Sequence, residues 1–126
     1  MWLNPKDMSE WAYFYCMIKD RPKFRKYITD PKWAYNYCNH VNDIPEVWKN
    51  ITESRWAYSY CRYIKDRLII RKNITESFWA YKYCSNVKDI PEVRKNITDS
   101  RWAYHYCKWI KDRPEVRKYI KEIECG

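Results

Sequence analysis

Apolar residues recur along this chain at the intervals expected of helices that bury one side. Ala34, Tyr37, Cys38 and Val41 follow the order i, i+3, i+4 and i+7, which places all four on one face of a helix. A shorter segment repeats apolar residues in a similar way from Ile44 onward. Because neither segment is long enough to be stable alone, the pattern predicts helices that depend on packing against their neighbours.

The same pattern occurs five times. Each copy contains the tripeptide Trp-Ala-Tyr, and consecutive copies lie 22 or 23 residues apart. Repeats of this length stack so that each one covers the apolar face of the next. The sequence therefore predicts an all-α fold, an α-solenoid of about five 23-residue helix-turn-helix repeats in one domain, 1–126. The units are about 7–29, 30–52, 53–75, 76–98 and 99–126, with tripeptides at Trp11, Trp33, Trp56, Trp79 and Trp102.

Polar residues before each segment predict where the helices begin. Thr29 and Thr52 precede long helices, where a hydroxyl can accept a hydrogen bond from a free backbone N–H, and Asp7 opens a capping box in the first unit. We expect long helices of about three to four turns and short ones of about two. Leu68 replaces the proline that otherwise opens each short helix. The aspartates expected to cap the short helices are Asp20, Asp43, Asp66, Asp89 and Asp112, and the prolines are Pro22, Pro45, Pro91 and Pro114.

Composition restricts the kind of core. The chain has one glycine against 24 aromatic residues, made up of 8 Trp, 13 Tyr and 3 Phe, so folds rich in tight turns are disfavoured. The constant Trp, Ala, Tyr and Cys positions are expected to form the core instead. The five tryptophans in particular are expected to pack there rather than to stack on nucleic-acid bases.

Cysteine occurs once per repeat in the same local context. Equivalent positions of a repeat array face the same way, so these thiols are expected to be small buried apolar groups rather than a disulfide framework. That usage, with no signal peptide visible in residues 1–10, predicts a reduced, cytoplasmic setting. Cys125 lies outside the repeat, and we expect a free, exposed thiol there. The repeat cysteines are Cys16, Cys38, Cys61, Cys84 and Cys107.

Three Asn-X-Thr tripeptides begin at Asn50, Asn73 and Asn96. They would be glycan acceptors in a secreted protein. Their equivalent places in successive repeats, at a turn between helices, favour a structural role instead.

Residues 30–37, Asp-Pro-Lys-Trp-Ala-Tyr-Asn-Tyr, carry a resemblance to known proteins. A Pro or Ser, a charged residue and then Trp-Ala-Tyr-x-Tyr resembles the short α-helical repeat proteins encoded by large bacteriophages, giant viruses and AT-rich bacteria. The pattern covers nearly the whole chain, although Cys stands where those proteins often have Ala, and the Gly-Arg-Trp-Pro-Glu connector is replaced. The resemblance implies the architecture, and a phage or viral origin with the host cytoplasm as location, but no defined activity.

Patterns for catalysis or metal binding are scarce. His40 and His105 lie two residues from Cys38 and Cys107, about 200° apart around a helix, which does not suit a shared zinc ion. One glycine excludes a glycine-rich phosphate loop. Repeated identical residues also lack the single asymmetric group of side chains that catalysis needs. We therefore expect no enzyme activity, no metal and no cofactor.

Positions of the long helix that differ between copies predict a binding surface. Solenoids keep their scaffold constant and vary the exposed residues that contact a partner, and exposed Phe14, Met17, Tyr63 and Trp109 would anchor that partner. Unconstrained variation at a free surface explains the differences equally well, so both interpretations stay open. These candidate partner-binding residues, called the variable face below, are Phe14, Met17, Asn36, His40, Ser59, Arg62, Tyr63, Lys82, Asn86, His105, Lys108 and Trp109.

The Arg-Lys pair of each short helix, interrupted at Trp48-Lys49, predicts a second surface. The net charge of +9 favours anionic partners, and stacked pairs would form a stripe able to follow a phosphate backbone. A solvated face paired to nearby carboxylates is the commoner role of such charges. The candidate anion-binding residues, called the basic stripe below, are Arg25, Lys26, Lys49, Arg71, Lys72, Arg94, Lys95, Arg117 and Lys118.

Together these features predict a non-enzymatic protein that binds another macromolecule, first of all a protein. The resemblance to phage and viral repeats points to a host factor, including a defence component, that the protein would inhibit or redirect. Nucleic-acid binding by the basic stripe is one alternative, and sequestration of a small anionic nucleotide is another. We expect no membrane partner.

Overall fold

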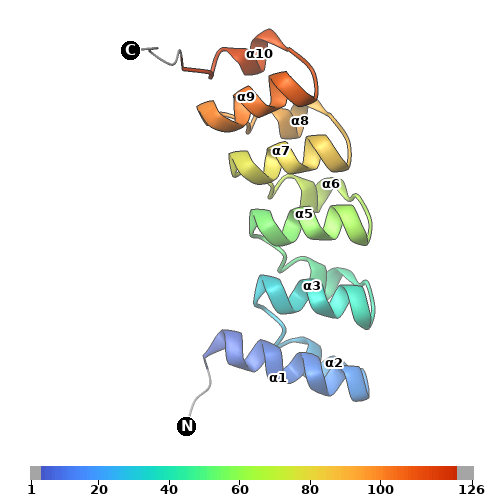
Figure 1. The fold of residues 1–126 in the computed structure, drawn as a ribbon. Helices are drawn as coiled ribbons and strands as arrows, with labels where there is room; N and C mark the ends of the chain where they lie inside the picture. The colour runs from blue at the N-terminus through green and yellow to red at the C-terminus, as the bar shows by residue number, and fades with distance from the viewer. Residues whose placement is uncertain (1–3, 122–126) are drawn as a thin grey trace. The chain divides into compact units, whose positions relative to one another are not determined.

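The computed structural model describes residues 4–121, and the regular structure in that range is entirely helical (Figure 1). Long and short helices alternate, and the pairs repeat about every 23 residues, which confirms the predicted all-α helical-repeat fold. The long helices are α1 (Pro5–Ile18), α3 (Pro31–His40), α5 (Ser54–Tyr63), α7 (Ser77–Asn86) and α9 (Ser100–Trp109). The short helices are α2 (Pro22–Arg25), α4 (Pro45–Trp48), α6 (Leu68–Arg71), α8 (Pro91–Arg94) and α10 (Pro114–Arg117).

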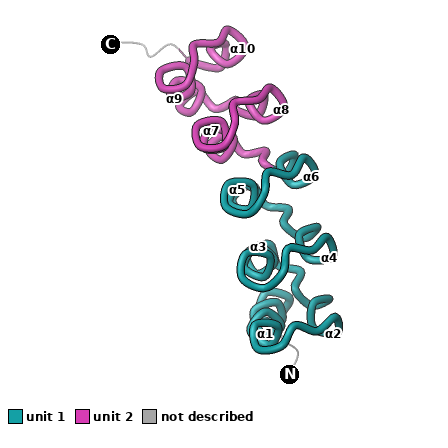
Figure 2. Tube along the Cα trace, turned by 90° about the vertical axis from the view of Figure 1, so that its right-hand side faces the viewer, with its two compact units in different colours: residues 1–73 teal, residues 74–126 magenta. Residues whose placement is uncertain are grey.

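The chain divides into two compact units, residues 1–73 and 74–126 (Figure 2). In the first unit α3 lies between α1 and α5, and each long helix packs against its own short helix. In the second unit α7 packs against α9, and each again contacts the short helix that follows it. Within each unit the repeats therefore stack on one another, as the sequence pattern predicts.

Positions that are constant between copies build the core of each unit. The alanine of every Trp-Ala-Tyr tripeptide is fully buried, and so is the second tyrosine of each repeat after the first. Small Ala side chains let helices approach closely, and the tyrosine rings fill the space between layers. The buried residues are chiefly Ala12, Ala34, Ala57, Ala80 and Ala103, with Tyr37, Tyr60, Tyr83 and Tyr106 and the isoleucines Ile28, Ile51, Ile74 and Ile97.

The repeat cysteines follow the prediction in four cases. Cys16, Cys38, Cys61 and Cys84 are buried free thiols, and Cys107 is half-buried. Burial raises the pKa of Cys38, Cys61 and Cys84 to about 12, so these thiols stay protonated and behave as apolar groups. The prediction for Cys125 lies outside the described residues.

The predicted caps of the long helices are wrong in their details. Helix α1 is capped by Asn4, whose side chain accepts a hydrogen bond from the backbone N–H of Asp7 at 2.8 Å, so Asp7 lies inside the helix. Asp30, rather than Thr29, caps α3. Glu53, rather than Thr52, precedes α5, and its side chain makes no capping hydrogen bond. The first residue of these helices is Pro5 in α1, Pro31 in α3 and Ser54 in α5. Since proline suits the first helical position, the cap is the residue just before it and not the predicted one.

The short helices differ more. Each is a single turn of four residues rather than two turns. The residue after each expected aspartate is the actual cap position, and it makes no side-chain capping bond. The prediction that Asp20, Asp43, Asp66, Asp89 and Asp112 cap these helices is therefore wrong. The four prolines do lie in the first turn, as predicted.

The tryptophans are also placed differently from the prediction. Trp11 is exposed, and Trp33, Trp56, Trp79 and Trp102 are half-buried rather than central to the core. The rings pack against the first tyrosine of the preceding repeat, with centroids 5.3 Å apart for Tyr13–Trp33 and 5.5 Å apart for Tyr35–Trp56 and Tyr81–Trp102. A cation from the preceding residue lies over the ring at Trp33, Trp56 and Trp102. At these three tryptophans a tyrosine and a cation therefore already lie against the ring on which a base would have to stack.

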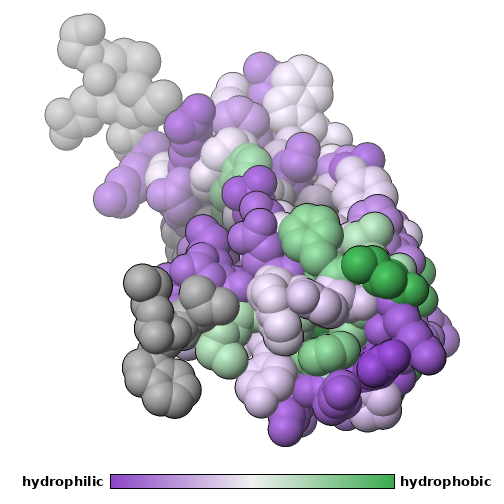
Figure 3. All heavy atoms as spheres, turned by 90° about the horizontal axis from the view of Figure 1, so that it is seen from below, coloured by the Kyte–Doolittle hydropathy of each residue, from purple (hydrophilic) through white to green (hydrophobic). Residues whose placement is uncertain are grey.

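The first repeat leaves aromatic side chains at its surface. Trp11 packs against Tyr15 and Phe24, with ring centroids 4.5 and 5.6 Å apart. Trp11 and Tyr15 are both exposed, whereas Tyr37 at the position matching Tyr15 is fully buried. Figure 3 shows this end of the first unit, where apolar side chains gather among hydrophilic ones. A tyrosine at this position is therefore buried by the repeat that precedes it.

Candidate functional site

A polar network joins consecutive repeats, and its centre is the aspartate between the long and short helices. The hydroxyl of Tyr37 donates to both carboxylate oxygens of Asp20, at 2.8 and 2.9 Å. The hydroxyl of Tyr60 donates to Asp43 at 2.6 Å. Each tyrosine belongs to the repeat that follows the aspartate, so the bond fixes one repeat against the next.

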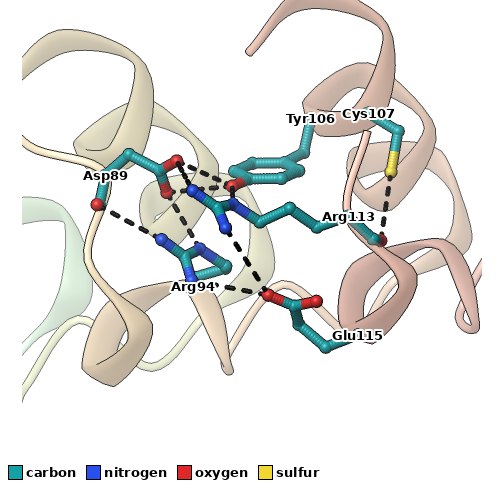
Figure 4. A network of polar contacts seen from close by, with 6 residues as sticks. All are labelled: Asp89, Arg94, Tyr106, Cys107, Arg113 and Glu115. Carbon is teal, nitrogen blue, oxygen red and sulfur yellow. Dashed lines mark hydrogen bonds and ion pairs between the residues drawn. The ribbon is translucent and has the colours of Figure 1, made fainter. Parts of the chain in front are cut away.

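The second unit shows the complete network (Figure 4). Tyr106 donates to the two oxygens of Asp89 at 3.0 and 2.8 Å, and Arg94 donates to Asp89 from the same repeat at 3.0 Å. Arg113 of the following repeat donates to the Tyr106 hydroxyl at 2.8 Å and forms an ion pair with Asp89 at 3.5 Å. Glu115 forms an ion pair with Arg94 across the same junction, at 3.5 Å.

The network sets the charge state of its members. Burial alone would raise the pKa of Asp89, but hydrogen bonds from Tyr106 and Arg94 and the arginine charges outweigh burial and hold the pKa below its usual value. The pKa of Asp20 is lowered in the same way by Arg25 and Tyr37. Burial and the bond to Asp89 raise the pKa of Tyr106 to about 12. Asp20 and Asp89 are therefore charged, and Tyr106 is neutral, at pH 7.

Four of the nine residues of the basic stripe, its arginines, form ion pairs with these aspartates. Each arginine pairs with the aspartate of its own repeat, at 3.0 Å for Arg25–Asp20, 3.1 Å for Arg71–Asp66, 3.0 Å for Arg94–Asp89 and 2.8 Å for Arg117–Asp112. The lysines of the stripe remain exposed, and these are Lys26, Lys49, Lys72, Lys95 and Lys118.

Sequence reasoning missed the second arginine of the network. Arg67 pairs with Asp43 of the preceding repeat at 3.1 Å, as Arg113 does with Asp89. A signal for it exists in the sequence, because the residue after the aspartate alternates between Arg and Ile along the chain. Arginine stands at 21, 67 and 113, each 46 residues after the last, and isoleucine stands at Ile44 and Ile90.

The asparagines of the Asn-X-Thr tripeptides form a second set of contacts between repeats. The side-chain amide of Asn50 donates to the carbonyl of Ile28 at 2.9 Å, Asn73 to Ile51 at 3.1 Å and Asn96 to Ile74 at 2.9 Å. The amide nitrogen to which a glycan would be attached is thus used in packing. These contacts agree with the structural role favoured by their repeated position.

The variable face lies on the solvent side of the long helices. Asn36, Ser59, Lys82 and His105 are half-buried, and the other eight predicted residues are exposed. Among the large aromatic residues in the range 4–121, Tyr63 and Trp109 are the most exposed, at 60% and 66%. The structure therefore separates these residues from the core, while their role in binding stays a prediction.

The two exposed aromatics share a local arrangement. The guanidinium of Arg62 lies 5.1 Å from the ring centroid of Tyr63, and the ammonium of Lys108 lies 5.0 Å from that of Trp109. Arg62 also donates to the hydroxyl of Tyr58 at 2.7 Å. A cation beside an exposed ring offers a partner both apolar area and a charged hydrogen-bond donor.

Residues 4–121 contain no group of three or more His, Cys, Asp or Glu that could hold a metal ion. In the same range no helix is long and apolar enough to cross a membrane. Comparison of the chain with protein-family models, with curated proteins and with solved structures found no match.

Proposed function

We propose that this protein is a non-enzymatic helical-repeat protein that binds a partner protein through the variable face. The observation that carries the proposal is that constant and variable positions of the repeat differ in their exposure to solvent. Residues that are constant between copies are buried or join neighbouring repeats, whereas residues that vary are mostly exposed. Repeat proteins that bind partners divide their positions in this way.

The chemistry of the exposed positions favours a protein partner. Tyr, Trp and Arg are the residues that most often dominate protein interfaces, and Arg62, Tyr63 and Trp109 supply all three types. A nucleic-acid partner would draw on the basic stripe, but its arginines are paired to aspartates. The resemblance to phage and viral repeat proteins makes a host protein the first partner to seek.

Site-directed photo-crosslinking tests the proposal. Tyr63 is replaced by the photoreactive residue p-benzoylphenylalanine, and the protein is irradiated in a nuclease-treated extract of its host cell. We expect one saturable crosslinked protein, which excess unlabelled wild-type chain displaces and excess Tyr63→Ala/Trp109→Ala chain does not. The same photoreactive residue at exposed Lys88, outside the variable face, is the matched control.

The proposal is overturned if the double variant competes as well as the wild type. It is also overturned if a parallel extract without nuclease gives the crosslink and the nuclease-treated extract does not, which would identify nucleic acid as the ligand. Because both side chains are exposed, the double variant should keep a free energy of unfolding within about 1 kcal/mol of the wild type, so loss of competition would not reflect unfolding.

A further inference from the structure

The short-helix side of the first unit departs from the repeat at the junction between the second and third repeats. Arg25 pairs with Glu46 of the next repeat at 3.3 Å, and Arg94 pairs with Glu115 at 3.5 Å. At the junction between the second and third repeats the matching residues are Trp48 and Ile69. Both members of an ion pair are therefore replaced by apolar residues at the same junction.

A third replacement lies beside them. Leu68 stands where the other short helices begin with proline. Leu68 and Ile69 are 61% and 50% exposed, so they do not serve only to pack the two repeats together. If Trp48 and Ile69 only replaced the ion pair between repeats, Ile69 would not need to be exposed and α6 would not need to begin with a leucine.

These three residues line a shallow groove between α4 and α6. Trp48, Leu68 and Ile69 form its apolar lining, and the groove has a volume of about 530 Å³. It continues into a neighbouring depression that shares Trp48 and Ile69. We call this surface the α4–α6 groove.

Positive charge surrounds the α4–α6 groove. Lys65 and Lys72 line it, and Lys49 lines the adjoining depression. All three lysines are exposed, and none forms an ion pair within residues 4–121. The negative charge nearby is used elsewhere, because Asp66 pairs with Arg71 at 3.1 Å. An apolar groove bordered by unpaired cations matches a ligand with apolar side chains flanked by carboxylates.

We propose that the α4–α6 groove is a second binding site, separate from the variable face, and that it takes an acidic peptide segment with aliphatic or aromatic anchors. A second copy of this chain fits poorly, because its net charge of +9 would repel the lysines. Nucleic acid fits poorly as well, since Leu68 and Ile69 offer no flat ring for a base to stack on and Arg67 already lies over the Trp48 ring, 5.3 Å from its centroid.

Peptide display with a repeat-matched variant tests this site. A random 16-residue library is selected on the wild-type chain and counter-selected on Trp48→Arg/Leu68→Pro/Ile69→Glu. These substitutions restore residues that the chain already uses at the matching places, Arg94, Pro45 and Glu46, so the fold should be retained. Leu68→Pro alone keeps the Trp48–Ile69 pair and serves as a second variant if the triple variant unfolds.

The selected peptides should be rich in Asp and Glu around apolar anchors. They should bind the triple variant at least about tenfold more weakly than the wild type, a difference of about 1.4 kcal/mol, and should weaken as salt screens the lysines. Tyr63→Ala/Trp109→Ala should bind them unchanged, which separates this site from the proposed function.

Two outcomes overturn the groove proposal. One is that no selected peptide distinguishes the wild type from the variants, or that the peptides that do so are neutral or basic. The other is that phosphatidylserine vesicles, rather than peptides, bind the wild type and lose binding in the variants, which would make the groove a membrane contact.

Discussion

Some residues in this chain make contacts between repeats that their local sequence does not reveal. Asp89 follows a long helix and precedes a proline-containing turn, a setting typical of a helix cap. Its carboxylate instead accepts hydrogen bonds from Tyr106 of the next repeat and Arg94 of its own. Local spacing could not identify Tyr106 or Arg113 as partners of this aspartate, because both are close in space but lie 17 and 24 residues away in the sequence.

Removing the hydroxyl of Tyr106 measures how much its hydrogen bond to Asp89 contributes to stability. Tyr106→Phe should lower the free energy of unfolding by about 1.5 kcal/mol, since a buried, charge-assisted hydrogen bond to Asp89 is lost. Urea denaturation followed by circular dichroism gives the value. Tyr104→Phe is the control: its ring is exposed, and its effect should stay within about 0.5 kcal/mol. Equal effects of the two substitutions would show that the bond to Asp89 contributes nothing.

For the helices, the sequence predicts which helices exist and their order along the chain better than it predicts the residues at which each helix begins and ends. The 23-residue period and the apolar faces of the long helices follow from spacing alone, and the structure confirms them. The short helices are half the predicted length, because the chain turns at Lys49 and its equivalents to place an asparagine against the preceding repeat. The tryptophans are less buried than expected because they pack at the edge between long helices.

The junctions between helix pairs also predict how stability depends on pH. The lowered pKa of Asp20 and Asp89 means that their contribution is present above the unfolded value of about 3.9 and is lost as pH falls through the folded values. Burial raises the pKa of Cys38 and the pKa of Tyr106 to about 12. Their contribution is therefore complete below the unfolded values of 9.0 and 10.0 and is lost as pH rises toward 12.

Melting temperature measured between pH 2 and pH 12 checks this dependence. We expect a plateau from about pH 5 to about pH 9 with a fall on both sides. Tyr106→Phe should reduce the alkaline fall, because it removes one ionisable group whose neutral form the fold favours. A melting temperature that stays constant up to pH 12 would contradict the account of the buried tyrosines and thiols.

At the scale of the whole chain, the five copies act as an internal comparison. Positions that stay constant build the stack, and departures from the repeat mark surfaces, either the variable face or the α4–α6 groove. The sequence identifies Tyr63, Trp109, Trp48 and Leu68 as departures. It could not show that Trp48, Leu68 and Ile69 share one groove, because that depends on how two repeats are placed against each other.

The proposed function requires that stability and binding reside in different residues of the same repeats. Its most direct test measures both quantities on matched variants, with the crosslinked partner as ligand. Tyr60→Phe and Tyr106→Phe should lower the free energy of unfolding and leave Kd within about twofold, whereas Tyr63→Ala and Trp109→Ala should leave stability unchanged and each raise Kd at least about tenfold. The proposed function is contradicted if the exposed substitutions leave Kd unchanged, or if they weaken binding only in proportion to a loss of stability.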